Sequence, residues 1–135
     1  MITRDYILRQ IQQLVQALAR VMMLRSTQQD EEAMIEVDRA LNELPELGVL
    51  IRSDLNRDDV LTTCGTGNDF NPEKALAVAD LLVEKAELVE DGVLRMRNLR
   101  YALWLYEAAL ATPAVAIPMD LYDRISWLKN LLDEA

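Results

Sequence analysis

The fold is decided by two stretches that share one pattern, AMIEVDRAL at residues 33–41 and ALWLYEAAL at residues 102–110. Both stretches have alanine at the first and eighth positions, and a proline follows each of them, Pro45 and Pro113. Small residues on one face of a helix let a second helix approach closely. The repetition predicts helical hairpins packed in series, an architecture that binds other molecules more often than it catalyses.

The composition favours a helical protein with an aliphatic core. The chain has 135 residues, of which 51% are hydrophobic and only 5% aromatic, with four glycines and four prolines. This length is typical of one domain, and the scarcity of turn residues and of alternating β-branched runs is typical of helices. We therefore expect an all-α fold without a sheet, formed by a single domain over residues 1–135.

Two antiparallel helical hairpins are expected, with an irregular insert between them and a capping helix after them. The first hairpin spans about residues 4–46, with Thr3 as an N-cap and a Ser26–Gln29 capping box between its helices. The insert spans about 47–71 and contains a short helix capped by Asn56. Asn71 and Pro72 then start a second hairpin over about 72–112, and a C-terminal helix covers about 119–133.

The repeated stretches resemble the second helix of a tetratricopeptide repeat (TPR). Ala33, Ala40 and Pro45 match the spacing of that helix, and Val37 stands where the family has an aromatic residue. The second copy has the aromatic residue, Tyr106, and the likeness covers roughly 14–45 and 79–113. The resemblance implies a TPR-like pair of hairpins that binds a protein or peptide. The opening segment, residues 5–11, also looks like that of a family of small uncharacterised bacterial proteins, which implies no activity.

Charge is unevenly distributed along the chain, whose formal net charge is −9. Residues 1–25 carry four arginines against Asp5, residues 26–91 carry 5 basic and 17 acidic residues, and the remainder is balanced. An acidic body argues against nucleic acid and anionic membrane as partners. The asymmetry also predicts that the basic first helix lies beside the acidic middle of the chain.

A cytoplasmic location is expected from the start of the chain and its cysteine content. Arg4, Asp5 and Arg9 occupy the segment where a secretory signal would need apolar residues. Uncharged apolar runs are shorter than a membrane span requires. A single cysteine, Cys64, allows no internal disulfide and fits a reducing compartment.

Catalysis, metals and cofactors are not expected. The sequence has no histidine, which removes the imidazole-based nucleophilic and metal sites. Asp54, Asn56 and Asp58 copy the first ligands of a calcium-binding EF-hand loop, but Gly65 stands where the chelating glutamate should be. The Gly65–Gly67 segment lacks the lysine of a phosphate loop, and acidic surroundings favour an inert Cys64.

Two groups of residues are candidates for contact with a partner. Arg95, Arg97 and Arg100 form a basic cluster that either pairs with nearby acids or contacts an acidic peptide. Tyr101 and Trp104 follow on the same predicted helix, where they pack in the core or line a groove.

The second group belongs to the first helix, whose apolar residues cover more than half of its circumference. Helix two covers only one face, so a second copy of the chain is expected to cover another. Ile7, Leu14 and Val21 are the candidate residues of this homodimer interface. The sequence thus predicts an interaction module, with a self-associating structural protein as the alternative.

Overall fold

The computed structural model describes residues 4–66, 69–112 and 117–133 of the chain. These residues form mainly helices, which confirms the all-α class. The one departure is a two-stranded antiparallel sheet of β1 (Gly65–Thr66) and β2 (Asp69–Phe70), in which Gly65 pairs with Phe70. The expectation of no sheet was therefore wrong for this short hairpin, which links the insert to the helix that follows.

The first hairpin consists of α1 (Arg4–Ser26) and α2 (Asp30–Glu43). The turn between them is a Schellman motif: Gln28 has a φ of 61°, its N–H donates to the Arg25 carbonyl at 3.0 Å, and the Gln29 N–H donates to the Leu24 carbonyl at 2.8 Å. The predicted capping box was wrong. Ser26 still belongs to α1, and its hydroxyl donates to the Met23 carbonyl at 2.7 Å.

The insert contains two short helices. The first, α3 (Val49–Arg52), was missed in the sequence because its four residues are too few to show helical periodicity. The second, α4 (Arg57–Thr62), was expected: the Asn56 side chain accepts a hydrogen bond from the Asp59 N–H at 2.9 Å. Asn56 is thus a helix cap, the role favoured over a metal ligand.

The second hairpin consists of α5 (Pro72–Leu88) and α6 (Gly92–Leu110). Its start confirms the sequence signal, because the Asn71 side chain accepts from the Lys74 N–H at 3.0 Å and Pro72 occupies the first helical position. Asp91 caps α6 by accepting from the N–H groups of Val93 and Leu94. The last helix, α7 (Leu121–Asp133), packs on α6.

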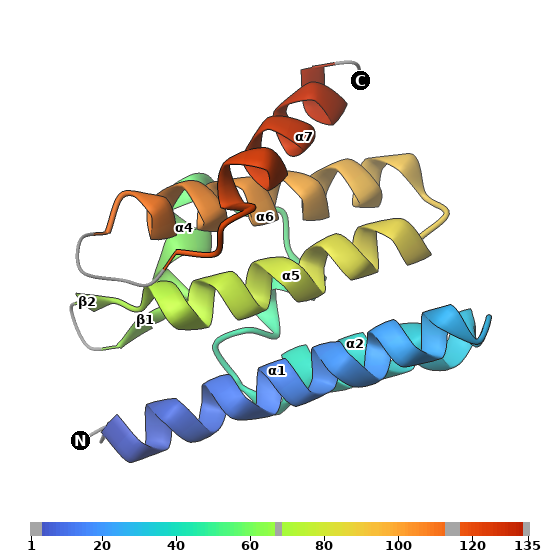
Figure 1. Ribbon diagram of the computed structural model, residues 1–135, viewed down its shortest axis with the longest axis horizontal. Coiled ribbons are helices and arrows are strands. Elements are labelled where there is room, and N and C mark those ends of the chain that lie inside the picture. The colour runs from blue at the N-terminus through green and yellow to red at the C-terminus, as the bar shows by residue number, and fades with distance from the viewer. Residues whose placement is uncertain (1–3, 67–68, 113–116, 134–135) are drawn as a thin grey trace.

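The arrangement of the helices places α5 against the first hairpin. Figure 1 shows α5 running beside α1, with α2 behind α1 and α7 crossing α6. The repeated alanines lie in the core as expected, since Ala33, Ala40, Ala102 and Ala109 are all at most 4% exposed. The predicted closing residue Pro113 and the predicted cap Thr3 lie outside the described residues.

Ion pairs tie the helices together, and two of them neutralise buried lysines. Lys74 pairs with Glu46 at 2.8 Å, and Lys85 pairs with Asp38 of α2. Arg20 of α1 pairs with Glu36 of α2 at 2.7 Å. Together with the pairs that Arg25 makes with α5, described below, this contact confirms that the basic first helix lies beside the acidic middle. Among the described residues, no helix is both long and apolar enough to cross a membrane.

Candidate binding groove

A hollow of about 310 Å³ opens where α1, α5 and α7 meet. Its walls carry both apolar and charged side chains from these helices, and Tyr106 of α6 forms part of its floor. The apolar lining residues are Leu18, Met22, Val83, Trp127 and Leu128, and the charged ones are Asp80, Glu84, Glu87 and Arg124. Met22 is 53% exposed and Trp127 is 43% exposed. Large apolar side chains that remain accessible in a hollow are typical of sites for protein contact.

A polar network holds the floor of this hollow. The Tyr106 hydroxyl donates to Oδ1 of Asp80, and Nη1 of Arg124 donates to the same oxygen at 2.9 Å. The Arg124 guanidinium also lies 5.9 Å from the centre of the Tyr106 ring, within range of a cation–π interaction. These contacts join α5, α6 and α7 through three side chains, so the floor has a defined shape.

The protonation states of the network suit a structural role. Burial raises the pKa of Asp80, while the hydrogen bond from Tyr106 and the charge of Arg124 oppose that rise. Burial and the nearby Asp80 carboxylate also raise the pKa of the Tyr106 hydroxyl, so this hydroxyl stays protonated at neutral pH. A raised carboxyl pKa also occurs in catalytic acids. Here, however, Asp80 Oδ1 already accepts from two protein donors.

The edge of the hollow is set by ion pairs between α1 and α5. Arg25 donates to Glu84 and, at 2.8 Å, to Glu87. Both carboxylates lie on the same face of α5 as Asp80, because the three residues are four and three positions apart. The α5 side of the hollow is therefore acidic, whereas the α1 side is apolar.

A second hollow, of about 260 Å³, lies at the other end of the same two helices. Arg4, Ile7, Leu8 and Ile11 of α1 line it together with Asn71 and Glu73 at the start of α5. Between the two hollows, Val15 of α1 is 52% exposed. We call these two hollows, together with the α1 residues from Leu8 to Met22 that span them, the α1/α5 groove.

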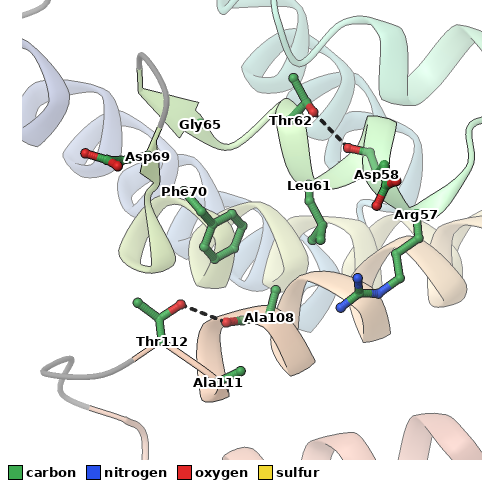
Figure 2. Close-up of a pocket in the computed structure, with 10 residues that line it drawn as sticks. All are labelled: Arg57, Asp58, Leu61, Thr62, Gly65, Asp69, Phe70, Ala108, Ala111 and Thr112. Carbon is green, nitrogen blue, oxygen red and sulfur yellow. Dashed lines mark hydrogen bonds between the residues drawn. The ribbon is translucent and has the colours of Figure 1, made fainter.

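A different hollow, of about 560 Å³, lies between α4, the β1–β2 hairpin and the end of α6. Figure 2 shows the Phe70 ring and the Leu61 side chain directed into it, with Arg57 at one side. The Thr62 hydroxyl donates to the Asp58 carbonyl, and the Thr112 hydroxyl donates to the Ala108 carbonyl, each at 2.8 Å. Both hydroxyls bond within their own helical segments, so the other polar side chains that line this hollow are those of Arg57, Asp58 and Asp69.

The five predicted partner contacts on α6 do not form one surface. Tyr101 is fully buried, and its hydroxyl accepts from the Leu55 N–H at 2.7 Å and donates to the Ser53 carbonyl at 2.8 Å. Its role is to hold the insert against α6, so of the two alternatives for Tyr101 the core position is confirmed and the partner contact was wrong.

The other four members of this group are dispersed. Arg97 donates to the Ile51 carbonyl at 2.9 Å and lies 6.0 Å from the Tyr101 ring centre. Trp104 is partly buried against the core, whereas Arg95 and Arg100 are exposed. Glu87, one of the acids near this cluster in the sequence, pairs with Arg25 instead.

The predicted dimer residues of α1 are also placed differently. Leu14 and Val21 are at most 1% exposed because they pack inside the chain's own core, so they are unavailable to a second copy. Ile7 is half-buried and lines the α1/α5 groove. The exposed apolar face of α1 is instead formed by Leu8, Val15 and Met22.

Two further candidates from the sequence were a reactive Cys64 and a metal site. Cys64 is buried, and burial raises the pKa of its thiol to about 12, which suppresses thiolate chemistry at neutral pH. Among the described residues no group of three or more acidic or cysteine side chains could hold a metal ion.

Comparison with known proteins adds no assignment, because no protein-family model, curated protein or solved structure matches the chain.

Proposed function

We propose that the chain is a non-catalytic interaction module of TPR-like helical type that binds a protein segment in the α1/α5 groove. The observation that carries the proposal is the exposed apolar surface along the groove, with Met22 and Trp127 at one end and Leu8 at the other. Isolated exposed apolar residues are common on proteins, but a row of them along a hollow is typical of a binding surface.

The course of the two helices supports the TPR-like character of the proposal. Early residues of α1 meet the start of α5, and Leu18 and Met22 meet the second half of α5. The first helices of the two hairpins therefore run in the same direction, side by side (Figure 1). Stacked hairpins of this kind form an extended surface from their successive helices, and extended surfaces suit peptide-like partners.

An unbiased peptide selection tests this proposal. Random peptides displayed on phage are selected on the immobilised protein, and the selected peptides are then measured against two variants. Met22→Asp places a charge in the groove, whereas Ile35→Asp changes an apolar residue of α2 that is 66% exposed outside the groove lining. We expect binding to be lost in Met22→Asp and kept in Ile35→Asp. Failure to select any peptide, or equal binding by both variants, would contradict the proposal.

Self-association through α1 is the second candidate, for one specific reason. Leu8, Val15 and Met22 are spaced by seven residues, and Ile11 and Leu18 lie between them. This three-and-four spacing is the seam of a coiled coil. Light scattering at micromolar concentration decides the question: a dimer that Val15→Asp converts to monomer supports self-association, and a wild-type monomer removes it.

A further inference from the structure

The charges of α5 are sorted between its two sides. Lys74 and Lys85 are at most 7% exposed and pair with Glu46 and Asp38, away from the groove. The carboxylates of the same helix line the groove: Glu73 lines one hollow, and Asp80, Glu84 and Glu87 line the other. An amphipathic helix normally scatters both signs on its wet side. Here the accessible side carries acids alone.

The groove keeps a negative balance after its internal ion pairs are counted. Arg25 and Arg124 pair with the carboxylates of the larger hollow, and Arg4 lies at the smaller one. Four carboxylates therefore face three arginines, within a chain whose net charge is −9. A long-range field of this sign attracts cationic partners and repels a second acidic copy.

Between Arg4 at one end and Arg25 at the other, the opposite wall of the groove is apolar and follows a helical line. Leu8, Val15 and Met22 lie one above another on α1, and the distance from the first to the last is roughly 21 Å at the 1.5 Å rise of a helix. Methionines such as Met22 adapt to different partner side chains. The half-exposed ring of Trp127 at the end of the groove can receive either an apolar side chain or a cation.

We propose, on the basis of the function proposed above, that the partner segment is an amphipathic helix with basic residues along one flank. Its apolar side lies on the α1 wall, and its lysines or arginines face the α5 carboxylates. A segment of about four helical turns matches the length of the apolar line. Two copies of this chain fit the groove less well, because each would bring an acidic α5 to the interface.

The test uses two synthetic peptides of about 14 residues, a length set by the groove. One is an amphipathic Leu–Lys helix and the other is the Leu–Glu helix with the same pattern. Binding of each fluorescently labelled peptide to the full chain is measured by anisotropy at low and high salt. We expect the Leu–Lys peptide to bind, more weakly at high salt, and the Leu–Glu peptide not to bind.

Two charge-matched variants show whether the binding depends on the groove. Glu73→Gln with Glu87→Gln removes two groove carboxylates, and Glu31→Gln with Glu32→Gln removes two exposed carboxylates at the start of α2. We expect the groove variant to weaken Leu–Lys binding about three- to tenfold and the α2 variant to leave it nearly unchanged. Met22→Asp, which keeps every groove carboxylate, should also weaken binding, and circular dichroism confirms that each variant is folded.

Several results would overturn the inference. Equal loss in the two charge-matched variants would show non-specific attraction to an acidic protein. Preference for the Leu–Glu peptide, or binding of neither peptide, would show that the occupant is not a basic helix. A wild-type dimer that Val15→Asp dissociates would assign the groove to a second copy. The peptide selection described above tests whether the groove binds any peptide. Selected peptides that bind in the groove but are not basic helices would refute this inference and leave the proposed function standing.

Discussion

Lys74 donates its ammonium to Oε1 of Glu46 at 2.8 Å, although Lys74 itself is only 1% exposed. Gln10 of α1 reaches the same carboxylate oxygen at 3.4 Å. This relationship links α1, the turn after α2 and the first turn of α5. Removal of the carboxylate would leave a buried ammonium without its partner, which is among the costly changes in a protein interior.

Glu46→Gln is therefore expected to lower the free energy of unfolding by about 1–3 kcal/mol at neutral pH, less than for a fully buried pair because Glu46 is partly exposed. Chemical denaturation measures the change. The matched control is Glu43→Gln, whose carboxylate pairs with the exposed Arg39 and should contribute less than about 0.5 kcal/mol. Equal stability of Glu46→Gln and wild type would show that Lys74 finds another partner.

The same pair predicts a dependence on pH. Burial acts to raise the pKa of Glu46, but the hydrogen bond and charge of Lys74 outweigh it, so the pKa lies below its usual value of 4.5. A carboxyl group with a lowered pKa stabilises the folded state above its unfolded pKa, and this contribution is lost as the pH falls through the folded pKa. The stability difference between wild type and Glu46→Gln should therefore shrink below about pH 4.5. A difference that stays constant with pH would contradict this assignment.

The repeated alanines should not tolerate enlargement. Ala109 is 1% exposed and Ala40 is 4% exposed, so a leucine at either position must displace neighbouring side chains. Ala109→Leu and Ala40→Leu are each expected to cost about 1–3 kcal/mol in thermal or chemical unfolding. Ala19→Leu, at an exposed position of α1, is the control and should be nearly neutral. A neutral Ala109→Leu would mean that α6 packs loosely at this point.

Gln28 offers a stabilising substitution. Its φ of 61° is in the left-handed region, where a side chain is unfavourable and glycine is the usual residue at the end of a helix. Gln28→Gly is expected to raise the free energy of unfolding by about 0.5–1 kcal/mol. Gln29, one residue later, is not in the left-handed region, so Gln29→Gly should lower the free energy of unfolding. A loss of stability in Gln28→Gly would show that the turn differs in solution.

Asn98 is the other position where a substitution should help. It is 1% exposed in α6, and its amide nitrogen and oxygen have no hydrogen-bond partner among the described protein groups. A buried amide without partners costs about 1–3 kcal/mol, so Asn98→Leu, of similar size, should raise the melting temperature. Leu99→Asn, the reverse change at the next buried position, should lower it. A lower melting temperature for Asn98→Leu would show that the Asn98 amide is hydrogen-bonded in solution.

The sequence predicted the long helices better than the turns between them. Asn71 and Asn56 determine their helix starts through local hydrogen bonds, and Pro72 does so through its fixed φ, so their roles could be predicted directly. The turn at Gln28 could not, because a Schellman motif usually contains glycine and the Ser26–Gln29 spacing suggested a different cap. The four residues of α3 and the four residues of the β-hairpin are too short to show a period.

The sequence contains only part of the information that is needed to locate the candidate groove. The spacing of Leu8, Val15 and Met22 was visible, but so was the spacing of Leu14 and Val21, and both lines are apolar. The choice between them is made by where α5 packs, which is a tertiary property. For the same reason the sequence left open whether Tyr101 is a core residue or a contact residue. The choice depends on the insert, whose backbone forms hydrogen bonds with the Tyr101 hydroxyl.

The most direct test of the central claim is a methyl NMR titration with a peptide from the phage selection. The chain has six methionines, and labelling of their methyl groups allows Met22 in the α1/α5 groove to be compared with Met96 on α6, outside the groove lining. Met22→Leu and Met96→Leu assign the two signals. Groove binding predicts that the Met22 signal shifts with peptide concentration while the Met96 signal does not. A bound peptide that shifts Met96 and leaves Met22 unchanged would contradict the claim.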